Sequence, residues 1–280
     1  MNERPSESEV PKSIAPAVDL RRLPGPFDII GDIHGCYDEL HALLGDLGYQ
    51  VIEATQVDGA PEIRVAPPAG RLLVLLGDLV DRGPKVVPTL RLAMGLRRDG
   101  TGLCAPGNHD DKLRRWLLGR PVRIAHGLRT SIDQLESEPP AFCDKTLAFL
   151  QRLPPYLILD GGRLICAHAG LPRALQGRDD RRAREAALYG VTTGEHDAAG
   201  YPTRIRWAET YHGDAFVVYG HTPVRQPEWI GATVNIDTGC VFGGSLTALR
   251  WPERETVSVP ALRVYDPNGR FDGRPTDDRP

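Results

Sequence analysis

The chain has few lysines for its 280 residues, and their positions exclude two nucleotide-dependent activities. Basic residues number 34, but lysine occurs only at positions 12, 85, 112 and 145. No lysine follows a glycine, so there is no G-x-x-x-x-G-K-[ST] loop to hold a nucleoside triphosphate. None begins a Lys-x-Asp-Gly segment, which excludes the lysine nucleophile of a nucleotidyltransferase. The formal net charge of -3 also argues against a global positive field for nucleic acid.

Paired cysteines and long apolar runs are absent too. The five cysteines show no CxxC spacing and stand mostly in apolar, strand-like runs, which favours reduced thiols packed in the interior. No segment reaches the roughly 20 apolar residues of a membrane span, and the first 18 residues lack the apolar stretch of a signal peptide. We therefore expect a soluble, cytoplasmic protein without a membrane partner.

What the chain does contain is a series of short segments that place acidic, imidazole or amide side chains beside glycine. The six segments are Gly31-Asp32-Ile33-His34-Gly35, Gly77-Asp78-Leu79-Val80-Asp81-Arg82-Gly83, Gly107-Asn108-His109-Asp110, Ala167-His168-Ala169-Gly170, Gly220-His221-Thr222-Pro223 and Asn235-Ile236-Asp237. Their oxygen and nitrogen ligands suit two hard or borderline metal ions such as Mn, Zn or Fe. A single aspartate beside glycine is an ordinary turn, but six such segments favour a metal centre.

The first half of the chain repeats a strand, a ligand-bearing loop and a helix three times. Apolar strands are predicted at residues 27–30, 72–76 and 102–105, and each precedes one of the first three segments. Apolar residues at helical spacing follow each loop. Loops at the carboxyl ends of strands are where α/β sheets bind ligands, so we predict an α/β fold with its site at the strand ends.

The second half divides into a mixed middle and a strand-rich end. Residues 120–211 are predicted to be a mixed, helical, cap-like segment that contains a hairpin of strands 156–159 and 163–166. Strands are then expected to build a second sheet packed on the first. Their predicted ranges are 216–219, 233–236, 245–249, 256–259 and 262–265.

One domain is expected, spanning residues 26–266. Residues 1–25 carry charges and prolines without an apolar period, and we expect a disordered leader there. Residues 267–280 are charged and rich in proline and glycine, which indicates a flexible tail.

The six segments resemble those of the phosphoprotein-phosphatase, or calcineurin-like, metallophosphoesterases. More narrowly, residues 27–262 are similar to the phosphatase module of bacterial polynucleotide kinase-phosphatase. That likeness depends on runs at residues 27–40, 107–113, 187–195, 235–244 and 246–249. The fold it implies is a four-layer α/β/β/α sandwich, in which helices flank two packed mixed sheets.

The resemblance also implies a pair of divalent metal ions. The implied ligands are Asp32 and His34 for the first ion, Asp78 for both, and Asn108, His168 and His221 for the second. The ions are expected to be Mn, with Ni, Fe, Zn and Co as alternatives. A hydroxide that bridges them would attack the phosphorus, since metal coordination supplies hydroxide at neutral pH.

Four further residues are assigned to catalysis by the same resemblance. His109 would be the general acid for the leaving group, and Asp81 would keep its imidazole protonated and oriented. Arg82 would grip the phosphoryl oxygens through its planar fork. Asp237 would orient a ligand or the nucleophile.

Several functions fit these residues. The first is hydrolysis of phosphate monoesters, or 2′,3′-cyclic phosphates, at nucleic-acid ends, mainly of RNA, with Trp207, Tyr211 and Trp229 as candidates to stack a base. Kinase or ligase steps would then need separately encoded partners. The second is a bis(5′-nucleosyl)-tetraphosphatase acting on a nucleotide. It fits because such hydrolases share the GDIHGCYDE, GDxxDRGPK and PGNH signatures with this chain.

Two further functions are weaker alternatives. A Ser/Thr protein phosphatase is the third. A non-catalytic metal- or phosphate-binding module would be expected to lack His109 or the bridging ligand.

Overall fold

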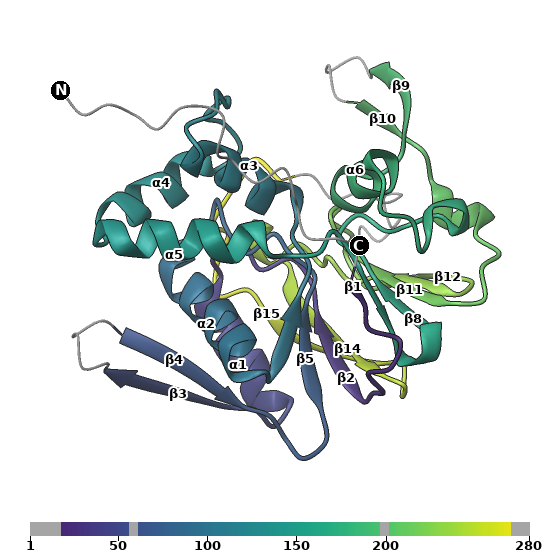
Figure 1. The fold of residues 1–280 in the computed structure, drawn as a ribbon, viewed down its shortest axis with the longest axis horizontal. Coiled ribbons are helices and arrows are strands. Elements are labelled where there is room, and N and C mark those ends of the chain that lie inside the picture. Colours follow the sequence, from purple (N-terminus) through teal and green to yellow (C-terminus); the bar gives the residue numbers. More distant parts are fainter. Residues whose placement is uncertain (1–17, 56–60, 197–201, 270–280) are drawn as a thin grey trace, which may run out of the picture.

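The computed structural model describes residues 18–55, 61–196 and 202–269. Residues 1–17 of the predicted leader and 270–280 of the predicted tail lie outside the described residues. The described chain forms a mixed α/β fold in which two mixed sheets are flanked by helices, so the predicted fold class is confirmed (Figure 1). Its helices are α1 Tyr37–Asp46, α2 Val86–Asp99, α3 Asn108–Leu117, α4 Leu128–Glu136, α5 Pro140–Gln151 and α6 Arg181–Tyr189.

The two main sheets each contain three neighbouring parallel strands. The five-stranded sheet has the order β15 (Glu255–Pro260), β14 (Ser245–Trp251), β2 (Phe27–Ile30), β5 (Leu72–Leu75), β6 (Gly102–Cys104). The six-stranded sheet has the order β1 (Val18–Asp19), β7 (Leu157–Leu159), β8 (Leu164–Cys166), β11 (Phe216–Tyr219), β13 (Thr233–Asn235), β12 (Glu228–Ile230). Strands β2, β5 and β6 are mutually parallel, as are β8, β11 and β13.

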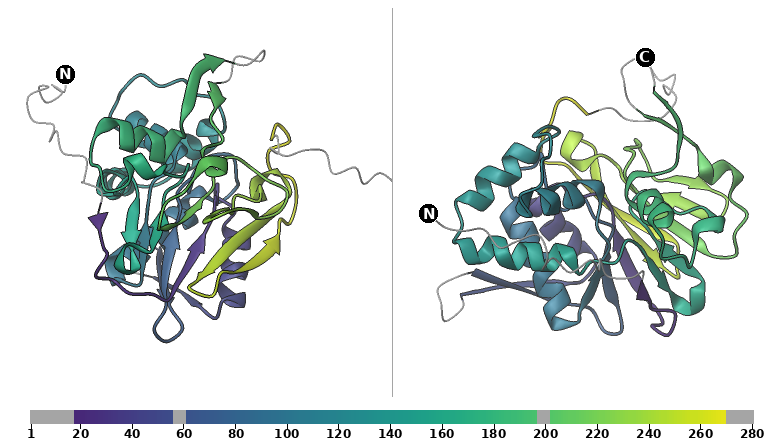
Figure 2. Two further views of the ribbon diagram at one scale, coloured as in Figure 1. Left: turned by 90° about the vertical axis from the view of Figure 1, so that its right-hand side faces the viewer. Right: turned by 45° about the horizontal axis from the view of Figure 1, so that its top comes forward.

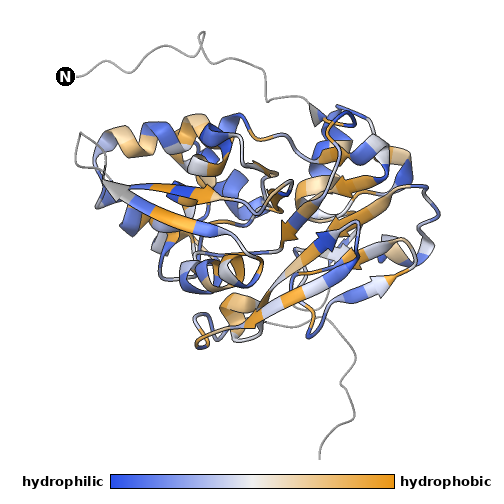
Figure 3. Ribbon diagram, turned by 90° about the horizontal axis from the view of Figure 1, so that it is seen from below, coloured by the Kyte–Doolittle hydropathy of each residue, from blue (hydrophilic) through white to orange (hydrophobic). Residues whose placement is uncertain are grey.

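Alternating side chains along these strands create separate apolar layers. Ile30 packs into the cluster beneath α1 and α2, whereas the adjacent Ile29 packs between the two sheets. In the second sheet Leu157 faces the same inter-sheet layer, and Ile158 faces the cluster that includes α6. Because successive strand residues point to opposite faces, both sheets are covered on both sides. In Figure 3, orange, hydrophobic residues alternate with white and blue, hydrophilic ones along the helices and strands.

The sheet topology brings the functional segments together. The loops after β2, β5 and β6 leave the carboxyl ends of parallel strands in one sheet, and those after β8, β11 and β13 do so in the other. The two sheets also join at these ends, since Ser245 N, at the start of β14, donates to Thr238 O, just beyond β13. Six loops from distant parts of the chain therefore surround one position.

Several predictions about the second half are wrong in detail. Strands β14 and β15 join the first sheet, where β14 pairs antiparallel with β2, rather than extending the second. Residues 262–265 form no strand. The predicted leader ends earlier than residue 25, because Val18–Asp19 pairs parallel with β7. Strand alternation indicates that a segment pairs, but it does not specify the partner.

Two hairpins were not predicted. Strands β3 (Gln50–Thr55) and β4 (Pro61–Ala66) form a ribbon whose buried Ile63 and Val65 belong to the cluster beneath α1 and α2. Strands β9 (Thr192–His196) and β10 (Pro202–Arg204) form a second ribbon that projects away from both sheets (Figures 1 and 2). No helix in the described part of the chain has the length and apolar character needed to cross a bilayer.

Candidate metal centre

The loops at the strand ends hold their residues in unusual backbone conformations. His34, Asp78, Asp81, Arg82 and His221 all have positive φ, between 47° and 73°. Non-glycine residues adopt this region at a cost, and such strain concentrates at functional sites. These conformations therefore lower the stability of the folded protein, and they are kept because they orient the side chains of the cluster.

Four of the predicted ligands converge on the side formed by β6, β8 and β11. His168 Nε2 lies 3.0 Å from Asn108 Oδ1 and 3.0 Å from His221 Nδ1. The same nitrogen lies 3.5 Å from Asp78 Oδ1. A carboxylate, an amide oxygen and two imidazole nitrogens form a donor set that suits a borderline divalent cation.

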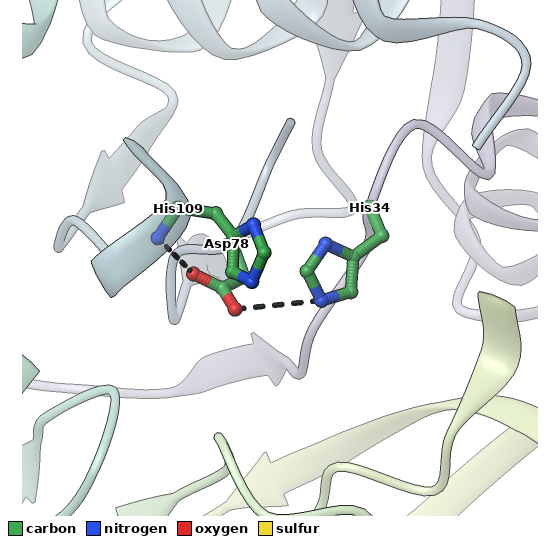
Figure 4. A group of neighbouring side chains, drawn as sticks. All are labelled: His34, Asp78 and His109. Carbon is green, nitrogen blue, oxygen red and sulfur yellow. Dashed lines mark hydrogen bonds and ion pairs between the residues drawn. The ribbon is translucent and has the colours of Figure 1, made fainter. Parts of the chain in front are cut away.

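Asp78 also faces the loop after β2, as Figure 4 shows. Its Oδ2 lies 3.4 Å from His34 Nε2. The other ring nitrogen of His34, Nδ1, donates to the backbone oxygen of Val80 at 2.8 Å, which leaves Nε2 as the acceptor. A backbone contact of this kind fixes the tautomer of metal-binding histidines. Asp78 thus stands between two groups of ligands, as a bridging residue would.

Asp32, in the loop after β2, contacts the ligands from the second sheet. Both its oxygens accept from His221 N, at 3.3 and 3.1 Å, and Oδ1 lies 3.9 Å from His168 Nδ1. Asp32 is 4% exposed and Asp78 is 2% exposed. The structure therefore brings all six predicted ligands into one buried cluster.

The electrostatics of the cluster fit cations. Burial, followed by repulsion from Asp237 and Asp78, raises the pKa of Asp32 well above its usual range. Burial lowers the pKa of His168 to about 3 and that of His221 well below its usual range, so both imidazoles are neutral. Neutral imidazole is the form that binds metal, and cations would offset the repulsion among the carboxylates.

Two glycines allow the loops to approach one another this closely. A Cβ at Gly107 would collide with the Asp78 carboxylate, and one at Gly220 would collide with Asp32 Oδ1. The glycines of the sequence segments are therefore required by close packing around the ligands as well as by sharp turns.

His109 and Asp81 form a buried pair beside the ligands. His109 Nδ1 lies 2.6 Å from Asp81 Oδ2, and His109 N donates to Asp78 Oδ1 at 3.0 Å. Burial, and next the positive charge of Arg82, lowers the pKa of His109 well below its usual value, while burial raises that of Asp81 to about 6. Asp81 is in place to orient the ring through this contact, and its role in keeping the imidazole protonated stays a prediction.

Two functional neighbours escaped the sequence analysis. Ser131 Oγ, on α4, donates to Asp81 Oδ1 at 2.6 Å and accepts from Asp81 N at 2.8 Å. Asp110 accepts from Leu79 N at 3.0 Å and from Gly107 N at 2.8 Å, which ties two ligand loops together. Asp110 ends the third sequence segment, but no local signal marks Ser131.

Arg82 and Asp237 complete the cluster. Arg82 Nη1 donates to His34 Nε2 at 2.6 Å, and Arg82 Nε lies 3.4 Å from Asp266 Oδ2. Asp237 is fully enclosed, accepts from Gly239 N at 3.1 Å, and has its pKa raised to about 6 by burial. Both residues therefore lie where contact with a phosphoryl group or a ligand is possible.

Comparison with known proteins identifies the family. The calcineurin-like phosphoesterase model matches residues 25–225. The chain is 47% identical over 244 residues to bis(5′-nucleosyl)-tetraphosphatase PrpE (asymmetrical) of Geobacillus sp. strain WCH70, covering 86% of this chain and 96% of that protein. Identity to the protein of the same name from Bacillus subtilis strain 168 is 45% over 244 residues, with the same coverage.

Solved structures agree. One that is provisionally described as a diadenosine tetraphosphatase is 26% identical, has a TM-score of 0.64, and is matched over 88% of this chain and 98% of its own. A protein serine/threonine phosphatase from Saccharomyces cerevisiae, 14% identical, has a TM-score of 0.58 over 90% of this chain and 86% of its own, which shows a common fold. The chain belongs to the calcineurin-like phosphoesterase family and is a metallophosphoesterase, a hydrolase of phosphoric ester bonds.

Proposed function

We propose that this enzyme is an asymmetrical bis(5′-nucleosyl)-tetraphosphatase, which adds water to a dinucleoside tetraphosphate and releases a nucleoside triphosphate and a nucleoside monophosphate. The observation that carries the proposal is the 47% identity to a protein of that name across 96% of its length. A match of that length covers the residues that surround the metal centre as well as the ligand loops.

This proposal reverses the order of the two nucleotide-related alternatives drawn from the sequence. The comparisons favour the tetraphosphatase, which stood second there, over the RNA-end phosphatase that stood first. The RNA-end function, with its separately encoded kinase or ligase partners, has no support among these relatives. A protein phosphatase has the support of a common fold alone, which does not specify a substrate.

The six clustered ligands would hold two divalent cations, with Asp78 between them. Bound cations of this kind lower the pKa of water and neutralise phosphoryl oxygens. We propose Mn for both positions, with Ni, Fe, Zn and Co as the other candidates, because the ligands are oxygen and imidazole nitrogen without thiolate. The five cysteines are all free, which suits the proposed cytoplasmic location.

The remaining residues act on the phosphate and the leaving group. Arg82 exchanges its contact with His34 for the phosphoryl oxygens, which it can hold through two parallel hydrogen bonds. His109 takes up a proton when the negatively charged substrate enters, and it transfers that proton from Nε2 to the departing oxygen. Asp81 fixes the orientation of the His109 ring through its contact with Nδ1. Asp237 orients the carboxyl group of Asp32 through a side-chain hydrogen bond.

A side-by-side activity panel with Mn tests the proposal. It compares diadenosine tetraphosphate, oligoribonucleotides ending in 2′-, 3′- or 2′,3′-cyclic phosphate, and a phosphoserine peptide. We expect kcat/KM to be highest for the tetraphosphate by at least about tenfold, or about 1.4 kcal/mol of transition-state preference. If an RNA end is preferred by that margin, the tetraphosphatase proposal fails and the RNA-end function replaces it.

A further inference from the structure

A pocket of about 700 Å³ opens directly beside the candidate metal centre. It is formed by the segment that follows α6, by residues 204–209 beyond β10, and by β11, β12 and the loop between β11 and β12. The pocket and the metal centre have His221 in common, whereas neither His109 nor Asp81 lines the pocket. A molecule in this pocket can therefore reach the ligand residue His221 from a side that does not include the proposed general acid.

The lining of the pocket combines apolar side chains with groups that can form hydrogen bonds. Val191, Ile205 and Ile230 contribute aliphatic side chains, and Trp207 contributes an aromatic ring. Glu228, at one side, offers carboxylate oxygens and lies 3.5 Å from Arg206 Nη2. A flat, apolar base and a ribose with two hydroxyl groups match such a lining, and the volume is within the range of small-ligand sites.

Arg204 lines this pocket close to the metal ligands. Its Nη1 donates to Thr222 Oγ1, one residue beyond His221. A phosphate chain that runs from the pocket to the metal centre would pass close to Arg204. The guanidinium can donate hydrogen bonds to the negatively charged phosphates.

We propose that the pocket binds one nucleoside of the substrate, with its base against Ile205 and its attached phosphate chain passing Arg204 toward the metal ligands. The inference rests on the proposed function, because it assumes that the substrate is a nucleotide. It assigns nucleoside recognition to the segment from Arg204, at the end of β10, to Glu209, which a phosphatase specific for phosphate alone would not need.

Calorimetric titration of the Mn-loaded protein tests the pocket without relying on turnover. The probes are AMP, ribose 5-phosphate, which lacks the base, and inorganic phosphate. We expect AMP to bind about tenfold more tightly than ribose 5-phosphate, because contact of one base with such side chains gives about that factor. Equal affinities for AMP and ribose 5-phosphate would overturn the proposal.

A pair of matched variants locates the base. Ile205 is 43% exposed and Ile52, on the distant β3, is 49% exposed, so Ile205→Asn and Ile52→Asn make the same chemical change at similar exposure. Ile205→Asn should weaken the affinity for AMP about fivefold and leave the affinity for ribose 5-phosphate within about twofold of its original value, since the apolar contact is to the base. Ile52→Asn should change neither. If the two variants behave alike, the base lies elsewhere.

The titration also separates this inference from the proposed function. Tight binding of AMP by a protein that does not hydrolyse diadenosine tetraphosphate would leave the nucleoside pocket in place and refute the tetraphosphatase. Hydrolysis of diadenosine tetraphosphate by a protein that binds AMP no better than ribose 5-phosphate would refute the pocket alone.

Discussion

Replacing Ser131 with alanine isolates the proposed role of the Asp81–His109 pair. The Ser131 hydroxyl donates to Asp81 Oδ1 and accepts from Asp81 N, while the other carboxylate oxygen contacts His109 Nδ1. Within the described residues, the Ser131 hydroxyl forms hydrogen bonds with Asp81 and with none of the predicted ligands or His109, so Ser131→Ala perturbs the acid only through Asp81. The variant also leaves the buried Asp81 N–H without its partner.

The size of the effect follows from the loss of one hydrogen bond to a buried carboxylate. Burial raises the pKa of Asp81 to about 6, and the hydrogen bond from Ser131 opposes that rise. Hydrogen bonds to charged groups contribute about 1.5–3 kcal/mol, so their loss should raise the pKa of Asp81 further, by about one to two units. The acid limb of the pH profile should therefore move to higher pH by that amount. Stability should fall by about 1–3 kcal/mol.

The assay is the pH dependence of kcat/KM for two substrates with different leaving groups. A ribose monophosphate has a basic alkoxide leaving group and depends on the acid, whereas p-nitrophenyl phosphate depends on it much less. The shift for Ser131→Ala should appear with the ribose monophosphate and be small with p-nitrophenyl phosphate. Ser137→Ala is the control, because Ser137 follows the same helix and its hydroxyl donates to the backbone oxygen of Asp133 in an exposed position.

Two results would refute the reasoning. A profile for Ser131→Ala that coincides with that of Ser137→Ala would show that the Ser131 contact does not influence the acid. An identical shift for both substrates would show that the titration affects the metal centre or substrate binding rather than proton donation.

Three further predictions concern the cluster itself. Asp78→Ala should abolish turnover and remove both metal ions, whereas Asp32→Ala should weaken the binding of chiefly one ion. Metal analysis of the purified variants measures this. Two ions retained in Asp78→Ala would contradict the bridging assignment. His109→Ala should reduce hydrolysis of a ribose monophosphate by about 10²- to 10⁴-fold and spare much more activity on p-nitrophenyl phosphate, so equal losses would indicate a structural or ligand role. In the folded, metal-free protein the pKa of Asp237 is about 6, against an ordinary value of 3.8, because burial disfavours the charged carboxylate. The protein therefore keeps its full stability below pH 3.8, where this group is protonated in both states, and loses stability as the pH rises through 6. Asp237→Asn should therefore stabilise the metal-free protein by about 2–3 kcal/mol near pH 8 and have little effect near pH 4, measured by denaturant unfolding, and the opposite pH trend would refute the burial of this charge.

The sequence was informative where ligands directly follow buried strands. Phe27–Ile30 and Leu72–Leu75 are short apolar runs that end at Asp32 and Asp78, so parallel pairing alone brings these two carboxylates to one edge. The structure brings together the predicted metal ligands, His109, Asp81, Arg82 and Asp237. Of the three candidates to stack a base, Trp207 lines the pocket beside the cluster, whereas Tyr211 and Trp229 do not.

The sequence was uninformative where function depends on contacts between distant segments. Ser131 lies 50 residues from Asp81, on a helix that carries no other site residue, and nothing in its neighbourhood distinguishes it from a surface serine. Likewise, the sequence of β14 indicates a buried strand without specifying its neighbour, so its pairing with β2 rather than β13 was set by tertiary packing. The lining of the nucleoside pocket could not be predicted from the sequence either, because Ile205 and Ile230 are distant in the chain and only the fold brings them to the same pocket.

Identifying the products formed from diadenosine tetraphosphate tests the central claim most directly. Ion-exchange chromatography of an early time course with Mn-loaded protein separates AMP, ADP and ATP. Asymmetrical hydrolysis predicts ATP and AMP in equal amounts from the first time point, with no early ADP. Two equivalents of ADP, or no product from an enzyme that dephosphorylates RNA ends under the same conditions, would contradict the account.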